Sequence, residues 1–470
     1  MRQCGIIREL FYLVRALSTR IKKIIKLLKG LLQRFNKEQP SVHPKAKPTI
    51  IPRSDHTISR TTIHRNALKV LYRLHQEGYQ AYLVGGCVRD LLLGRQPKDF
   101  DIATNALPEE MRKLFRNCRL IGRRFRLAHI LFGKDIIEVA TFRTHHENAQ
   151  EHHGKTHDGL IIRDNVYGTI EDDVWRRDFS INALYYNIAD FSIVDYTGGM
   201  ADIKAKRLRM IGQPEQRFQE DPVRLLRAVR FMGKLNIEIS PETEACLAKS
   251  SHLLTHVSPA RLFQEVLKFF QEGATVPTFK LLQQYNLFQQ LFPQTLFNPE
   301  DTHAQQLIDQ VLINTDQRIA EGKSISPAFL ITAFLWPSMN QQARLNRSEG
   351  MPAYVSLEKA IQTMLTLQTQ RLAIPRNVLV SMRDICLLQY HLMSRQGYRP
   401  YRTLDHPRFR AAYDLLLLRS TAGEPVEELA LWWTEFQKAD RAGQEQLIKR
   451  VATQHRPKKK RPYNRKKKVT

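Results

Sequence analysis

A short stretch near residue 90 constrains this chain more than any other part of its sequence. Residues 83–94 read LVGGCVRDLLLG. This pattern predicts a buried strand, a turn at Gly85 and Gly86, and a brief helix that ends at Gly94. Glycine at such a turn lets backbone amides approach the oxygens of a phosphate group.

Two carboxylates follow this turn. Residues 98–104 read KDFDIAT, which predicts a strand. Asp99 and Asp101 would share one face of that strand, about 7 Å apart, while Phe100 and Ile102 pack on the other. Carboxylates at this spacing can share divalent cations. Either pattern alone is more often a solvated strand or a plain turn, but their combination predicts metal-assisted phosphoryl or nucleotidyl transfer.

The whole segment 83–104, LVGGCVRDLLLGRQPKDFDIAT, resembles the first motif of the polymerase-β-like nucleotidyltransferases. The branch in question contains CCA-adding enzymes and bacterial poly(A) polymerases. The resemblance implies an α/β nucleotidyltransferase head, followed by an all-helical neck and body. It also implies that Asp99 and Asp101 are catalytic and hold two Mg²⁺ ions, which Mn²⁺ could replace. Glu138, on a later predicted strand, is the candidate for a third metal ligand, unless it is an ordinary edge residue.

Residues 175–184, WRRDFSINAL, resemble the second motif of the same family. Alone they would indicate a surface cluster of ion pairs, although Arg176 and Arg177 could also hold phosphate oxygens. The resemblance makes Asp178 functionally essential, and leaves open whether it contacts metal, ribose or an arginine. The nucleotide ligands implied by the two motifs are Gly85, Gly86, Arg89 and Arg177.

Residues 220–231, EDPVRLLRAVRF, place Arg224 and Arg227 on one helical face beside two acids. An acid next to arginines can read a base edge, because a carboxylate accepts and a guanidinium donates. In the family this element selects the nucleotide in place of a template. We therefore expect a neck that closes over the nucleotide, the alternative being a merely charged helix face.

The charge distribution indicates an RNA partner. The chain has 470 residues, enough for several domains, and a formal charge of +27. Residues 1–60 contribute +11 and residues 451–470 contribute +9, so the middle is only mildly basic. The terminal tail has little apolar surface, and we expect it to be disordered and to bind RNA phosphates. Five cysteines, without a Cys-x-x-Cys pair, favour a reducing cytoplasm over a disulfide framework or zinc site.

The N-terminus has a different character. Apolar residues at helical spacing between residues 7 and 35, opposite a basic face, predict an amphipathic helix. It could lie on an anionic membrane surface, or be an appendage to the body or a non-essential extension. The domains we expect are an N-terminal segment and linker (1–60), a head (61–205), a nucleotide-selecting neck (206–275), an RNA-binding helical body (276–440) and a disordered basic tail (441–470).

One further segment separates the two branches of the family. Residues 120–130, LIGRRFRLAHI, resemble the stretch that distinguishes bacterial poly(A) polymerases from CCA-adding enzymes. Arg123, Arg124 and Arg126 would add positive surface near the cleft. The predicted function is template-independent addition of AMP from ATP to RNA 3′ ends, making tails that in bacteria typically promote decay and quality control. We expect a monomer acting on mRNA and other transcripts. The alternatives are CCA addition to tRNA and a non-catalytic RNA-binding adaptor.

Overall fold

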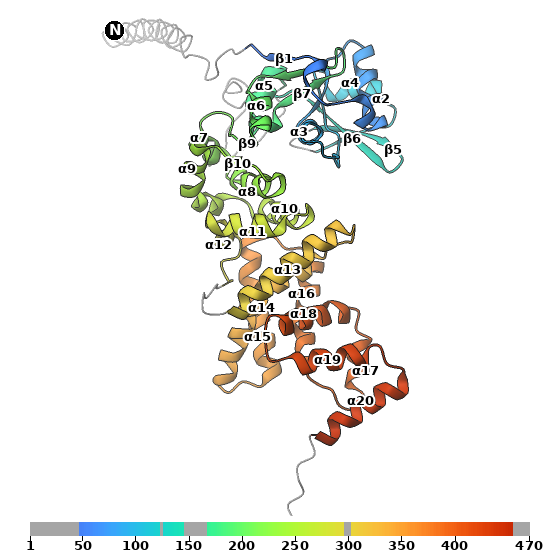
Figure 1. Ribbon diagram of the computed structural model, residues 1–470, viewed down its shortest axis with the longest axis vertical. Helices are drawn as coiled ribbons and strands as arrows, with labels where there is room; N and C mark the ends of the chain where they lie inside the picture. Colours follow the sequence, from blue (N-terminus) through green and yellow to red (C-terminus); the bar gives the residue numbers. More distant parts are fainter. Residues whose placement is uncertain (1–46, 123–125, 145–166, 296–301, 455–470) are drawn as a thin grey trace, which may run out of the picture. The chain divides into compact units, whose positions relative to one another are not determined.

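The computed structural model describes residues 47–122, 126–144, 167–295 and 302–454 (Figure 1). The chain divides into two compact units, residues 1–177 with 183–198 and residues 178–182 with 199–470. The predicted N-terminal helix, Arg123, Arg124 and the tail beyond Gln454 lie outside the described residues. We call the two units the head and the helical unit.

The head is built on a mixed sheet of eight strands in the order β1-β8-β7-β2-β3-β6-β5-β4. Its strands are β1 (Thr49–Ile51), β2 (Ala81–Val84), β3 (Ile102–Thr104), β4 (Cys118–Ile121), β5 (Leu127–Phe132), β6 (Asp135–Thr141), β7 (Leu184–Asn187) and β8 (Ile193–Asp195). Its helices are α2 (Arg65–Gln76), α3 (Gly86–Leu92), α4 (Pro108–Leu114) and α5 (Ile170–Trp175). Neighbouring strands are antiparallel except for β3 and β6, which pair in parallel with Ile102 opposite Val139.

Apolar periodicity explains how the head holds its helices. Ala67, Val70, Leu71 and Leu74 recur at helical spacing in α2 and are fully buried. Full burial of each larger side chain contributes about 1.5–3 kcal/mol. Helix α3 is short because Gly94, with φ 69°, follows its last turn. The prediction that this helix ends at Gly94 is therefore confirmed.

Two features of the head differ from the sequence predictions. The strand predicted over 98–104 begins only at Ile102, so Asp99 and Asp101 precede it. Their exposure still alternates with the burial of Phe100 and Ile102, which preserves the predicted face. Within the predicted linker, residues 49–51 form β1, because this short apolar run pairs with β8 across the sheet.

The helical unit begins at Asp178, includes the 3-10 turn η4 (Ser180–Asn182) and continues along the chain after Gly198. The elements up to residue 295 are α6 (Gly199–Lys204), β9 (Arg207–Leu208), α7 (Pro214–Glu220), α8 (Val223–Leu235), β10 (Glu238–Ile239), α9 (Pro241–Lys249), α10 (Pro259–Gln271), α11 (Thr275–Gln284) and α12 (Leu287–Leu291). Those after residue 301 are α13 (Thr302–Ala320), α14 (Pro327–Ser348), α15 (Ala353–Arg371), α16 (Arg376–Leu392), α17 (Arg399–Leu404), α18 (Phe409–Thr421), α19 (Glu427–Phe436) and α20 (Arg441–Gln454). The prediction of a helical neck and body is confirmed, apart from the two-residue strands β9 and β10, which pair in parallel.

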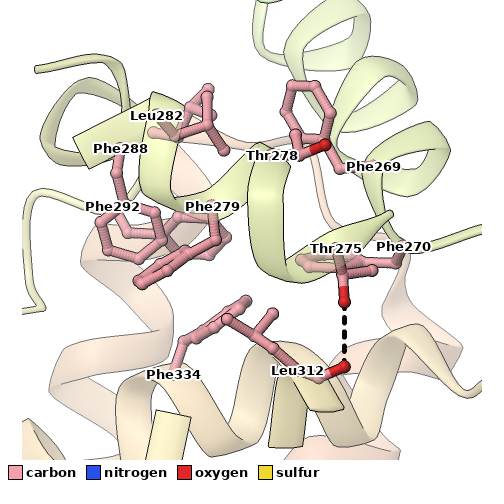
Figure 2. A pocket seen from close by; sticks show the side chains of 11 residues that line it. Phe269, Phe270, Thr275, Thr278, Phe279, Leu282, Phe288, Phe292, Leu312 and Phe334 are labelled. Atoms are coloured by element: carbon pink, nitrogen blue, oxygen red, sulfur yellow. Dashed lines mark hydrogen bonds between the residues drawn. The ribbon is translucent and has the colours of Figure 1, made fainter. Parts of the chain in front are cut away.

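Phenylalanines hold α11 and α12 against α14 (Figure 2). Phe279 packs edge-on against Phe288 at 5.0 Å between ring centroids and stacks on Phe334 at 5.9 Å. The hydroxyl of Thr275 donates to the carbonyl of Leu312 at 3.0 Å, which ties α11 to α13. The void left between these side chains is about 10 Å³. A space of this size holds no more than one water, so this is a packed core and not a ligand site.

The end of the described chain corrects the predicted start of the tail. Residues 441–454 form helix α20, where we expected disorder from residue 441 onward. Leu447 and Val451, four residues apart, are buried in a core that contains Trp433 and Phe436 of α19. This apolar pair gives the segment enough buried surface to fold. Among the described helices, none is long and apolar enough to cross a membrane.

Candidate active site

The glycine turn joins β2 to α3 at one edge of the predicted site. Gly85 has φ 77° and ψ −131°, a conformation that other residues rarely adopt. Arg89 of α3 is buried, and its Nε donates to Asp90 Oδ1 at 2.9 Å. A Cβ atom on Gly86 would lie 3.5 Å from Arg89 Nη2, so the guanidinium of this arginine packs against the turn.

Asp99 and Asp101 lie between this turn and β3. The backbone carbonyl of Asp101 accepts from the amide of Val84 at 3.1 Å, so the sheet fixes the main chain here. Part of the Asp101 side chain remains exposed. The surrounding protein nevertheless removes much of the water around the carboxylate, and this desolvation raises its pKa to about 6. The negative charge of Glu138 raises this pKa further, and the positive charge of Arg177 lowers it. The head therefore brings these charged groups to one place.

Glu138 comes from β6, the parallel neighbour of β3. Its carboxylate is about half exposed and lies 3.3 Å from Nε2 of His129 on β5, its cross-strand partner. Among the described residues, no three His, Cys, Asp or Glu side chains stand close enough together to hold a metal ion. A metal held by Asp99 and Asp101 would therefore take other ligands from water and substrate oxygens, as Mg²⁺ commonly does.

Arg177 is held in place by two buried partners. Its Nη2 donates to Asp173 Oδ2 at 2.9 Å, and its Nε donates to the hydroxyl of Tyr185 at 2.8 Å. Burial alone would raise the pKa of Asp173, but the charges of Arg177 and Arg176 outweigh burial and hold it well below its usual range. Sequence reasoning overlooked Asp173 and Tyr185. The spacing of Asp173 to the two arginines, three and four residues, was a signal for the first of them.

Asp178 belongs to the helical unit and contacts an arginine. Its Oδ2 accepts from Nε of Arg227 at 2.7 Å, and its Oδ1 accepts from the Phe179 amide at 2.8 Å and from the Asn182 side chain at 3.1 Å. Burial would raise the pKa of Asp178, but the charge of Arg227 and these hydrogen bonds lower it to about 2. The sequence left open whether Asp178 contacts metal, ribose or an arginine, and in the structure it contacts the arginine Arg227.

Arg224, one turn earlier in α8, is largely buried. Its Nη1 donates to the carbonyl of Arg217 at 2.6 Å and to Glu220 at 3.0 Å. The adjacent acid, Asp221, pairs with Arg261 at 2.9 Å. The predicted site residues thus fall into two groups. Those in the head are Gly85, Gly86, Arg89, Asp99, Asp101, Glu138 and Arg177, and those in the helical unit are Asp178, Arg224 and Arg227.

Comparison with known proteins identifies the family. Residues 81–209 match the model of the poly A polymerase head domain, residues 236–297 that of a probable RNA and SrmB-binding site of polymerase A, and residues 349–468 that of a polymerase A arginine-rich C-terminus. Poly(A) polymerase I of Salmonella typhimurium is 46% identical over 94% of this chain and 97% of its own length. The chain belongs to the poly(A) polymerase I family. The Haemophilus influenzae member is 47% identical over 89% of this chain and 95% of its own length.

CCA-adding enzymes match a smaller part of the chain. The Bacillus subtilis enzyme is 40% identical over 48% of this chain and 55% of its own length. A solved structure of a tRNA-processing enzyme in its apo form covers 85% of this chain and 98% of its own, with TM-score 0.56 and 22% identity. At this identity the likeness shows the fold alone. The predicted family and fold class are confirmed, and the CCA-adding alternative is not favoured.

Proposed function

We propose that this chain is a poly(A) polymerase that transfers AMP from ATP to the 3′ end of RNA without a template. The observation that carries the proposal is the 46% identity with poly(A) polymerase I over 94% of the chain. In the reaction the 3′ oxygen of the RNA attacks the α-phosphorus of ATP, and pyrophosphate leaves. Repetition at each new 3′ end would build a poly(A) tail.

We assign the metal-binding role to Asp99 and Asp101. Their donor atoms are carboxylate oxygens with exposed edges, and hard oxygen ligands of this kind fit Mg²⁺. When bound, two such ions would activate the 3′ hydroxyl and neutralise the charge on the leaving pyrophosphate. Glu138 acts on Asp101 through its charge. It is the third carboxylate near the proposed metal site, but it is not one of the two that we assign as metal ligands.

The arginines receive different roles from their contacts. Arg177, fixed by Asp173 and Tyr185, presents a cation that need not reorganise when a triphosphate arrives. The backbone amides after Gly85 supply neutral donors to the same phosphates. Arg89 was predicted as a phosphate clamp, but its burial against Asp90 favours support of the turn.

Asp178 acts in this proposal through Arg227. The carboxylate fixes the guanidinium from one side, so Asp178 is a positioning residue and not a ligand of metal. Arg224 is fixed in a similar way by Glu220. We propose that these two guanidinium groups of α8 select adenine by donating to the base edge.

RNA 3′ ends and ATP are the proposed substrates, and the enzyme would act as a monomer in the cytoplasm. The basic N-terminal segment would add peripheral contact with anionic membranes. The experiment is incubation of the purified protein with RNA, Mg²⁺ and each labelled nucleotide separately. Long extension with ATP alone is expected. Addition of two C and one A to tRNA would instead indicate CCA addition, and no incorporation would indicate the RNA-binding adaptor.

A further inference from the structure

A basic hollow of about 420 Å³ lies between the end of α16 and α17, in the helical unit. Both helices lie in the segment that matches the arginine-rich C-terminal model. Among the described residues that line the hollow, none is acidic. The lining residues that matter here are Tyr390, His391, Arg399, Arg402, Thr403 and His406.

Two of these residues are arginines available to an anion. Arg399 and Arg402 are exposed, and within the described part of the chain neither guanidinium pairs with a carboxylate. Other arginines of the same region behave differently: Arg395 pairs with Glu428 at 2.9 Å. A guanidinium without a protein partner can give paired hydrogen bonds to a phosphate group.

The two histidines add donors to the same space. Nδ1 of His406 accepts from the backbone amide of Arg408 at 3.0 Å, so a neutral ring carries its proton on Nε2. The pKa of His391 lies below its usual range because the ring is partly dehydrated, and because the charge of Arg402, and that of His406 when its ring is protonated, lie beside it. A phosphate in the hollow would relieve this crowding of positive groups.

Apolar side chains stand exposed beside the cations. Met393 is 66% exposed and Tyr398 is 64% exposed, more than any other large apolar side chain among the described residues. Met393 immediately precedes Ser394, which lines the hollow, and Tyr398 immediately precedes Arg399. Proteins that bind single-stranded nucleic acid usually combine cationic side chains, which contact the phosphate backbone of the strand, with aromatic rings on which its bases stack.

The walls of the hollow are well supported. Nε1 of Trp433 donates to the carbonyl of Leu392 at the end of α16, at 2.9 Å. On the other wall, Tyr401 of α17 is buried against Phe436, with ring centroids 5.5 Å apart. Both anchors belong to one hydrophobic core, so the arginines of α17 project from a fixed base.

We propose that this hollow binds single-stranded RNA, with one backbone phosphate held by Arg399 and Arg402 and a neighbouring base stacked on Tyr398. The inference rests on the proposed function, in which RNA is the substrate, and adds a subsite far in sequence from Asp99 and Asp101. A phosphate could also come from free ATP. The exposed ring beside the arginines and the absence of acids fit a strand that passes through the hollow.

The test compares two double variants of the full-length protein. R399Q/R402Q removes the arginines of the hollow, and R344Q/R347Q removes two exposed arginines from α14 that have the same spacing and no carboxylate partner among the described residues. Binding of a labelled oligo(A) strand without ATP, and of ATP without RNA, would be titrated for each. We expect R399Q/R402Q to weaken RNA binding about tenfold and to lower the salt slope by about 0.7 for the lost phosphate. ATP binding should not change, and the control should change RNA binding by less than about twofold.

Equal loss in both variants would overturn the proposal, because net charge alone would then explain it. Weaker ATP binding with unchanged RNA binding would assign the hollow to free nucleotide and also overturn it. Y398A should weaken RNA binding about tenfold while Y398F should not, as expected for stacking. These titrations need no catalysis. If the wild-type chain binds RNA through the hollow but incorporates no AMP, the proposed function fails and the subsite remains.

Discussion

The buried ion pair between Asp178 and Arg227 should link the stability of the helical unit to its activity. Asp178→Asn keeps the shape of the side chain and removes its charge, leaving the guanidinium of Arg227, about a third of whose side chain is exposed, without a counter-ion. The pKa of Asp178 falls to about 2 in the folded protein, against an ordinary value near 4. This difference corresponds to about 2–3 kcal/mol of stability near neutral pH.

The sign of the pH dependence follows from the direction of this shift. The folded protein holds the pKa of Asp178 below its unfolded value, so the stabilisation is fully present above about pH 4. It disappears as the pH falls toward about 2, where the folded carboxylate also takes up a proton. We therefore expect the difference in unfolding free energy between wild type and D178N to be constant from pH 7 to about pH 5 and to shrink below about pH 4.

Urea unfolding of wild type, D178N, R227Q and the double variant gives the measurement. A double-mutant cycle at pH 7 should show a coupling of about 2 kcal/mol, because each single variant leaves a buried or half-buried group unpaired. Effects that add to within about 0.5 kcal/mol would refute the reasoning, since the two residues would then act independently.

Asp202 offers a matched control for activity. It is also buried in the helical unit, and it accepts from Nε of Arg209 at 2.9 Å and from Ser180 at 2.6 Å. D202N should destabilise the unit to a similar degree and leave AMP incorporation per folded molecule unchanged. D178N should lose most incorporation. Equal activity losses in the two variants would mean that Asp178 contributes stability alone.

Three further changes test other parts of the proposal. Asp99→Ala or Asp101→Ala should abolish AMP incorporation and leave the RNA dissociation constant within about twofold, as measured by extension assays and titration; substantial residual activity would contradict the metal assignment. Gly85→Ala should lower the free energy of unfolding by about 1–2 kcal/mol, because φ is 77°, and should also lower AMP incorporation. The control Gly94→Ala, at φ 69° and away from the phosphates, should lower the free energy of unfolding to a similar degree and leave AMP incorporation normal. Deleting residues 455–470 should reduce the salt slope of RNA binding by about 2–4 without changing nucleotide choice; an unchanged slope would make the tail a solubility device.

The parts of the site that the sequence predicts are those set by local pattern. The turn at Gly85, the short helix up to Gly94 and the alternation of Asp99 and Asp101 with buried neighbours all depend on a few adjacent residues. Apolar periodicity likewise predicts the long helices beyond residue 207. Such patterns are readable because helix and strand geometry repeat over two to four residues.

What the sequence could not predict are pairings between distant segments. Strand β1 has only three residues, too few to show a period, and it exists because Thr49 pairs with Asp195 and its neighbours follow. The same limit applies to Asp178, whose partner Arg227 is 49 residues away. An acid and an arginine are visible in any sequence, but their distance is decided by tertiary packing.

Consecutive residues of the second motif show why these distant partners matter for function. Arg177 is the last residue of one head segment and is fixed by Asp173, whereas Asp178 begins the helical unit and fixes Arg227. In both places a buried carboxylate keeps a guanidinium charged and oriented before any nucleotide is present. Catalysis benefits from donors that need no reorganisation as charge develops on the phosphates. The second motif, with two arginines and one acid, therefore provides cations that are already in place before the nucleotide binds. The family resemblance indicates that these residues matter, but only the fold shows which partners hold them in position.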